Sequence, residues 1–469
     1  MLKIGVGPSS SHTLGPWRAA EKFINTLKQK NLFQKTTGIK VKLYGSLSLT
    51  GKGHATDLAV MLGLSGFKPE TIILENIAST ISKINETNIL NLNGENSIKF
   101  NPSKEIEFLQ DFLPFHSNGI SFIAFLGQGS VYSETYYSIG GGFIVQEAET
   151  EIKKEAKKTV PFEISTGEEL LNCLSQNSNF LISDFARKNE EALGRSEKQI
   201  IQDLAKIWNV MWDSIFTGVI TEGILPGGLN VQRRAASFFA KIFNNLKPKS
   251  KEEMFEMIKA KQNLTFNETL DFIDIFAFAV NEVNASLGRV VTAPTNGSAG
   301  VIPAVLAYYL CFINKDGGEK EITNFLLTCG LIGGIFKSGA TISAAAGGCQ
   351  AEIGVSAAMA AAALTELQGG SPEQAIVAAE IAMEHHLGMT CDPIGGLVQI
   401  PCIERNTMGV VKAINASNIA MKTNPSETVV SLDNVIKTML ETANDMNVKY
   451  KETSTGGLAL RVSVNNTEC

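Results

Sequence analysis

The sequence predicts an α+β protein in which a small N-terminal α/β domain precedes a larger, mostly α-helical domain. Up to about residue 145, short runs rich in β-branched and aromatic residues alternate with stretches of helical periodicity. From about residue 165, long helical stretches dominate and β-rich runs become few. Eight charged residues lie between Glu147 and Lys158, which is typical of a solvated linker. We therefore expect domains at residues 1–150 and 165–469.

Strands and helices are expected to alternate along the first domain. Clusters of β-branched and aromatic residues predict strands at residues 38–49, 71–77, 120–127 and 136–145. Apolar residues at helical spacing predict helices at residues 16–30 and 54–66. We interpret the three glycines within residues 139–143 as a tight hairpin. The alternative is a phosphate cradle for pyridoxal phosphate, although no Schiff-base lysine is recognisable.

Long helices are expected in the second domain at residues 190–220 and 269–288. Another helix should begin with Ser371 as N-cap, Pro372 in the first turn and Gln374 as the capping-box residue, and end near Gly388. Small residues dominate residues 329–367. They allow either close packing of helices or the close approach of a bulky bound group.

An uncharged segment at residues 290–314 is long enough to cross a bilayer. Pro294, Gly297 and Pro303 interrupt its first half, so we expect a buried core helix and no membrane association. The N-terminal residues lack the apolar core of a secretory signal, which predicts a cytoplasmic protein. Under that expectation, seven cysteines favour free, catalytic or metal-binding thiols over a disulfide framework.

The overall composition excludes two classes of protein. Hydrophobic residues make up 44% of the chain and charged residues 19%, which indicates a folded globular protein rather than a disordered one. The net charge is −6 and the pI is near 5.6, which argues against a nucleic-acid partner.

Three cysteines are candidates for one metal centre. Cys391 and Cys402 lie in a segment rich in proline and glycine, and Cys349 lies in a glycine-flanked turn at the expected start of a helix. Their spacing matches neither zinc ribbons nor bacterial ferredoxins, so the spacing leaves the presence and kind of metal open. Three thiolates on a four-iron cluster would leave one iron free to act as a Lewis acid.

Two turns near the N-terminus carry further candidate residues. Ser9, Ser10, Ser11, His12 and Thr13 follow a glycine turn and precede an expected helix, where hydroxyls and free amides suit a carboxylate or a phosphate. These serines could also be an ordinary helix cap. Lys52 and His54 lie in a similar glycine turn, and a single such histidine is more often structural than catalytic.

Six segments form an ordered set along the chain: GVGPSSSHT, GSLSLTGKGHATD, YYSIGGGF, GILPGGLNVQRRAA, GRVVTAPTNGSAG and AMEHHLGMTCDPIGGLVQIPCIERN. The set closely resembles the single-chain iron-sulfur L-serine dehydratases of bacteria, and the resemblance runs from residue 4 to residue 469. It implies that the helical domain is catalytic and that the first domain is of the effector-domain type. The implied cofactor is a [4Fe-4S] cluster held by Cys349, Cys391 and Cys402.

The resemblance also implies roles for individual residues. His54 is the expected base. The expected substrate-binding residues are Ser9, Ser10, Ser11, His12, Thr13, Lys52, His116, Asn118 and Asn296, and we add Lys337 as a candidate for the substrate carboxylate. Cys469, the last residue, carries a thiol and an α-carboxylate on the carbon skeleton of serine. We expect it to be a tethered fourth ligand that serine displaces.

Two positions depart from the family pattern. The chain has Ala299 where many members have a cysteine, so that cysteine is no required ligand here. The segment before Cys349 reads AAAGG and lacks the acidic residue common in the family, which leaves the tuning of the cluster by its surroundings open.

The implied function is the conversion of L-serine to pyruvate and ammonia by an oxygen-sensitive lyase of amino-acid catabolism and gluconeogenesis, expected as a homodimer. Three alternatives stay open. They are a non-catalytic iron-sulfur sensor, a zinc-stabilised amino-acid-binding regulator and a pyridoxal-dependent dehydratase.

Overall fold

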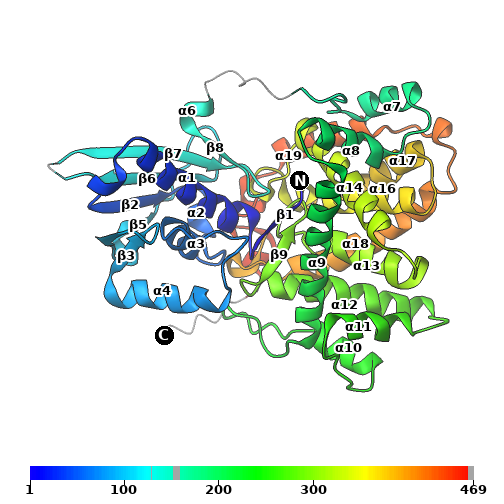
Figure 1. Ribbon diagram of the computed structural model, residues 1–469, viewed down its shortest axis with the longest axis horizontal. Helices are drawn as coiled ribbons and strands as arrows, with labels where there is room; N and C mark the ends of the chain where they lie inside the picture. Colours follow the sequence, from blue (N-terminus) through cyan, green and yellow to red (C-terminus); the bar gives the residue numbers. More distant parts are fainter. Residues whose placement is uncertain (128, 151–158, 463–469) are drawn as a thin grey trace.

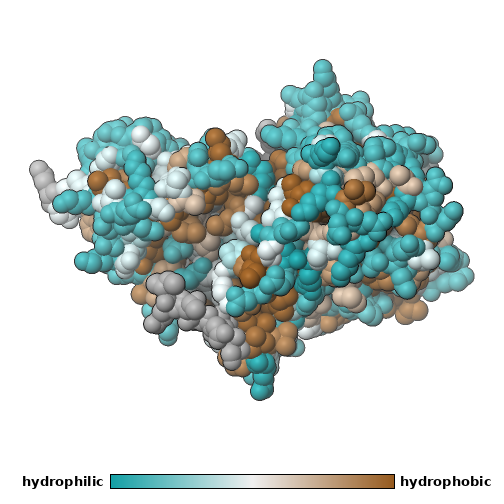
Figure 2. Space-filling view, turned by 90° about the horizontal axis from the view of Figure 1, so that it is seen from below, coloured by the Kyte–Doolittle hydropathy of each residue, from teal (hydrophilic) through white to brown (hydrophobic). Residues whose placement is uncertain are grey.

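The computed structural model describes residues 1–127, 129–150 and 159–462. Figure 1 shows two regions side by side, a sheet with helices from the N-terminal part of the chain and a larger helical mass from the rest. The predicted α+β class is confirmed. Seen from below, the outer surfaces of both regions are mostly hydrophilic, and hydrophobic residues gather near the middle of the molecule (Figure 2).

The N-terminal region is built on a five-stranded sheet with the strand order β5-β2-β6-β7-β8. Its strands are β2 (Gly38–Leu43), β5 (Ile106–Phe108), β6 (Gly119–Phe125), β7 (Val131–Ser138) and β8 (Ile144–Gln146). The β2–β5 pair is parallel, and the other neighbours are antiparallel. Buried and half-buried residues alternate along β2, so one face of the strand faces the core.

Both helices predicted in this region are present. They are α1 (Gly15–Gln29), which packs against β6 and β7, and α3 (Thr56–Leu64), which packs against α1. The buried ring of Phe23 in α1 stacks on Phe122 of β6 with 5.1 Å between ring centroids. Both helices confirm the sequence prediction, and together they form the core of the N-terminal region.

The predicted strand at residues 71–77 is wrong, because α4 (Glu75–Thr87) begins inside it. Ile77, Ile81 and Ile84 are buried at helical spacing, so the apolar period that continues past residue 77 decides the element. The short hairpin that follows was not predicted; it consists of β3 (Ile89–Leu92) and β4 (Asn96–Lys99), and α5 (Pro102–Glu105) comes next. The end of the strand expected at residues 38–49 is instead the short helix α2 (Ser46–Leu49).

The first strand of the chain lies outside this sheet. β1 (Lys3–Val6) pairs antiparallel with β9 (Arg289–Thr292), between the two regions (Figure 1). This pairing brings the residues that follow β1 to the junction between the α/β region and the helical region.

The helical region is centred on α16 (Ile353–Leu367), which is buried over nearly its whole length. It packs against α13 (Val301–Tyr308), α14 (Glu319–Gly339), α17 (Pro372–Glu384) and α18 (Cys402–Ala420). Its alanines allow these neighbours to approach closely, so helix packing explains the run of small residues at residues 353–363. The predicted cap of α17 is confirmed, because Ser371 and Gln374 form a capping box.

The other helices surround this centre. They are α7 (Gly167–Gln176), α8 (Ile182–Ala192), α9 (Glu197–Ile220), α10 (Ala235–Ile242), α11 (Lys251–Lys259), α12 (Phe266–Asn284), α15 (Ala344–Gly347) and α19 (Leu432–Asp445). The short α6 (Glu147–Thr150) instead contacts β7 and β8 of the N-terminal sheet. The core helix expected in the apolar run at residues 301–313 is α13, which is buried as predicted. Among the described helices, α14 is long and apolar enough to cross a membrane, and 56% of its apolar window is buried inside the structure.

Candidate functional site

The two N-terminal turns singled out by the sequence meet at one place. The residues Ser10–Leu14 form a wide helical turn before α1, and the Ser9 hydroxyl accepts a hydrogen bond from the His12 amide at 3.2 Å. Thr13 Oγ1 donates to the carbonyl of His54 at 2.7 Å. Thr56 Oγ1 donates to the carbonyl of His12, also at 2.7 Å. These bonds hold the two buried imidazole rings 4.5 Å apart, centroid to centroid.

The hydrogen bonds define the tautomer of His54. Its Nδ1 lies 2.9 Å from the carbonyl oxygen of Thr50, which can only accept, so Nδ1 carries the hydrogen. Nε2 therefore presents a lone pair, and it is buried without a hydrogen-bond partner among the described residues. Burial lowers the pKa of His54 to about 4, so the ring is neutral near pH 7.

His12 has the other tautomer. The Ser46 hydroxyl donates to the carbonyl of Glu452 at 2.8 Å, so it accepts from His12 Nε2 at 3.0 Å. His12 Nδ1 then accepts a hydrogen bond from the Ser11 hydroxyl at 2.8 Å. Burial holds the pKa of His12 well below its usual value, so this imidazole is neutral too.

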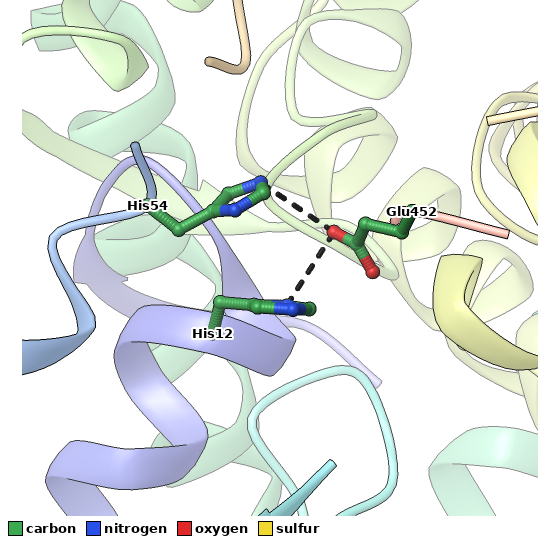
Figure 3. A group of neighbouring side chains, drawn as sticks. All are labelled: His12, His54 and Glu452. Carbon is green, nitrogen blue, oxygen red and sulfur yellow. Dashed lines mark ion pairs between the residues drawn. The ribbon is translucent and has the colours of Figure 1, made fainter. Parts of the chain in front are cut away.

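Glu452 faces both histidines. Its Oε1 lies 3.5 Å from His12 Nδ1 and 3.6 Å from His54 Nε2, and Figure 3 shows the carboxyl group beside the two rings, with one oxygen directed at both. The backbone of Glu452 has φ of 57°, and its amide donates to the carbonyl of Cys391 at 2.9 Å. Glu452 is not among the site residues predicted from the sequence. No motif marks it, because a left-handed glutamate cannot be told from an ordinary one by sequence.

Three buried thiols lie on the helical side of the site. Cys349 is in a tight turn before α16, Cys391 bridges to Lys451, and Cys402 begins α18. Sγ of Cys349, Sγ of Cys391 and a carboxylate oxygen of Glu352 all lie within 4.8 Å of one another. Cys402 Sγ is outside this group of three. Burial is the main cause that raises its pKa, and the nearby Cys349 thiol raises it further.

Arg405 supplies positive charge to these thiols. One guanidinium nitrogen donates to Cys349 Sγ at 3.3 Å and to the carbonyl of Thr390 at 2.7 Å, and the other lies 3.2 Å from Asp392 Oδ1. A hydrogen bond from Cys391, together with Arg405, lowers the pKa of Cys349 to about 7. Burial raises the pKa of Glu352 to about 8. The centre thus favours a thiolate at Cys349.

Close backbone contact joins the two halves of the site. A Cβ on Gly53 would lie 2.7 Å from the carbonyl oxygen of Gly396 and 2.8 Å from that of Gly395. The turn that carries His54 can therefore reach the cysteine segment only with glycine at this position. A Cβ on Gly297 would similarly meet the Glu352 carboxylate at 2.8 Å, which gives the TAPTNG segment a packing role.

His116 and Asn118 lie behind Ser11. The Asn118 amide donates to His116 Nδ1 at 3.1 Å, and its side-chain nitrogen donates to the Ser138 carbonyl at 3.2 Å. The Ser138 hydroxyl in turn donates to the carbonyl of Ser11 at 2.6 Å. These two residues support the serine turn from the sheet side.

Three other predicted substrate-binding residues have different surroundings. Asn296 is fully buried and bonds to the Val6 carbonyl, the Asn284 side chain and the Thr292 hydroxyl, which ties β1 to the helical region. Lys52 is exposed, with its ammonium group 5.7 Å from the centroid of the Phe108 ring. The ammonium group of Lys337 lies 3.3 Å from the centroid of the Phe143 ring. Cys469 lies outside the described residues.

Comparison with known proteins covers both regions. A family model described as serine dehydratase beta chain matches residues 1–149, and one described as serine dehydratase alpha chain matches residues 177–459. An L-serine dehydratase of Haemophilus influenzae is 47% identical over 99% of both chains. L-serine dehydratase TdcG of Escherichia coli is 47% identical over 98% of both chains. An L-serine dehydratase of Helicobacter pylori is 40% identical over 98% of this chain and 97% of its own.

Proposed function

Because the chain belongs to the serine dehydratase family, with matches across both regions, we propose that it converts L-serine to pyruvate and ammonia. The observation that carries this proposal is the position of His54. Its unprotonated Nε2 lies 3.6 Å from the carboxyl group of Glu452. The backbone amide of Glu452 donates a hydrogen bond to the carbonyl of Cys391. A base and a thiol centre therefore share one buried site. Dehydration of serine needs a base for the Cα proton and an acid that assists the leaving hydroxyl group, and a metal held by the thiols would supply the acid.

We propose that Cys349, Cys391 and Cys402 hold a [4Fe-4S] cluster. The donor set fits, because all three thiols are free and buried, Sγ of Cys349 and Sγ of Cys391 lie within 4.8 Å of each other, and Arg405 offsets negative charge at Cys349. Soft thiolate ligands favour iron-sulfur clusters over hard cations. When bound, the cluster would supply an open iron as a Lewis acid for the substrate hydroxyl.

In the proposed reaction His54 removes the Cα proton. The Thr50 carbonyl holds the hydrogen on Nδ1, so Nε2 is free to accept a proton. The lowered pKa of about 4 keeps the imidazole in its basic, neutral form. His12 is less available as a base, because its Nδ1 already accepts a hydrogen bond from the Ser11 hydroxyl.

The products follow from the atoms removed. Loss of the Cα proton and the β-hydroxyl releases water and leaves 2-aminoacrylate. This enamine tautomerises to an imine, and water hydrolyses the imine to pyruvate and ammonia with no net oxidation. We propose that the Ser9–Thr13 turn binds the substrate beside His54, since its hydroxyls are buried there.

The test is pyruvate formation from L-serine by protein purified without oxygen, with iron and sulfide counted on the same sample. We expect activity together with about four irons and four sulfides per chain, both lost in air. Air-stable activity that hydroxylamine abolishes would replace the proposal with a pyridoxal mechanism. A full cluster without pyruvate would favour a sensor.

A further inference from the structure

The part of the site formed by His12, His54 and Glu452 has no cation among the described residues. His54 Nε2 has a lone pair and no partner among the described residues. The ion pairs of the described chain give Glu452 no lysine or arginine, only the two neutral histidines. Burial, and then the acidic groups Glu352 and Cys349, raise the pKa of Glu452 well above its usual value, so the carboxylate form needs a positive partner. A buried carboxyl group normally has a cationic partner, and here the described residues supply only the Ser11 hydroxyl at 3.5 Å and the backbone amide of Ala345.

The backbone that carries this carboxyl group is fixed in a strained conformation. Glu452 has left-handed backbone geometry, which a glycine would adopt with less strain. Its carbonyl is fixed by Ser46 and its amide by the carbonyl of Cys391. The Ser11 hydroxyl lies 3.5 Å from Oε2, the outer limit of a hydrogen bond. The main chain is thus anchored at both polar groups, while the carboxyl oxygens keep capacity to accept.

We propose that Glu452 binds the α-ammonium group of the amino-acid substrate. This inference rests on the proposed function and adds a specificity determinant to it. An ammonium group supplies both missing elements, a positive charge and several N–H donors. Because Oε1 lies 3.6 Å from His54 Nε2, an ammonium group bound at Glu452 places the adjoining Cα beside the base. One contact therefore selects the substrate and presents the proton that leaves.

A consequence is discrimination against acids that lack the amino group. Such a molecule would bury Glu452 opposite no cation, and a buried polar group left unpaired is penalised strongly. D-Serine and 3-hydroxypropanoate form a matched pair of probes, because both have a hydroxyl and a carboxylate and only D-serine has the α-ammonium group.

The experiment compares the inhibition constants of these two probes on the cluster-loaded enzyme and on Glu452→Gln. In the unaltered enzyme D-serine should bind about 10- to 100-fold more tightly than 3-hydroxypropanoate, as a charge-assisted bond in a buried site requires. In Glu452→Gln this preference should fall to about threefold or less, with KM for L-serine raised by a factor similar to the lost preference. Glu404→Gln, an exposed carboxyl on α18, is the matched control and should keep the preference.

Each outcome is decisive. Equal binding of the two probes to the unaltered enzyme would overturn the inference without any variant. An undiminished preference in Glu452→Gln, with iron and sulfide content equal to that of the unaltered enzyme, would also overturn it. Should Glu452→Gln not load iron, Glu452→Asp replaces it, and the shorter carboxylate should weaken the preference without removing it. Absence of pyruvate from L-serine in the unaltered enzyme would instead contradict the proposed function.

Discussion

At the scale of single residues, the site is a set of side chains whose protonation is set by their neighbours. The glycine turn made His54 a candidate from sequence. Its proposed role as a base depends on the Thr50 carbonyl, four residues earlier, which fixes the hydrogen on Nδ1. Helical and turn patterns locate a residue but do not give its tautomer. Sequence patterns did not predict Glu452 either, because its proposed role depends on contacts with residues about 400 positions away.

Replacing His54 by glutamine tests the base. We expect turnover to fall by about 10²- to 10⁴-fold, because a positioned general base contributes that much. Iron and sulfide content should not change, since the described contacts give His54 no bond to a cysteine. His385→Gln, on an exposed histidine, is the control. Turnover retained in His54→Gln would move the base to His12 or His116.

The dependence of kcat/KM on pH at low pH is a second test of His54 as the base. Burial depresses the pKa of His54 from its usual 6.5 to about 4, so the basic form persists as the pH falls from 8 to 5.5. The kcat/KM profile should therefore show no loss from this group in that interval. A limb near pH 6.5 would mean that an ordinary, exposed histidine is the base.

At the scale of secondary structure, long and strongly periodic elements were predictable and short ones were not. The capping box at Ser371 and the apolar period of α1 and α12 located these helices from sequence. The strand expected at residues 71–77 was wrong, because a short apolar run fits a strand and a helix equally well. The β1–β9 pair joins residues almost 300 positions apart, and no local pattern reports such a pairing.

Gly53→Ala tests how these elements meet. The added Cβ would lie under 3 Å from the carbonyl oxygens of Gly395 and Gly396, so the His54 turn must separate from the cysteine segment. We expect a loss of about 1–3 kcal/mol in the free energy of unfolding, and a larger relative loss of turnover. Gly334→Ala in α14 is the control. Its Cβ meets nothing within 4 Å, and alanine should stabilise the helix by about 0.5–1 kcal/mol. If Gly53→Ala had the same unfolding free energy and turnover as the unaltered protein, the close contact between the two turns would not be required.

At the scale of the whole molecule, the site exists only where the two regions meet. His12 and His54 come from the α/β region, the three cysteines come from the helical region, and Glu452 comes from near the end of the chain. Sequence motifs predicted most of these residues separately. Their assembly depends on tertiary contacts such as the Ser46–Glu452 bond, which spans 406 positions. The charge balance that leaves a place for a cation appears only after assembly.

The end of the chain gives the last prediction, on the proposal that Cys469 is a tethered ligand of the cluster. Its thiol and α-carboxylate match the groups of serine, and a tethered group competes at an effective concentration in about the millimolar range. Deleting Cys469 should therefore lower the apparent KM for L-serine, because the substrate no longer displaces a competitor. It should also shorten the life of the cluster in air, since the open iron loses its cover. Both effects are checked by following the cluster absorbance after mixing with air and by measuring initial rates without oxygen.

The control is Cys173→Ser, which removes a half-buried thiol elsewhere and should change neither KM nor the life of the cluster. A deletion variant equal to the unaltered enzyme in both measurements would reduce Cys469 to an incidental terminal residue.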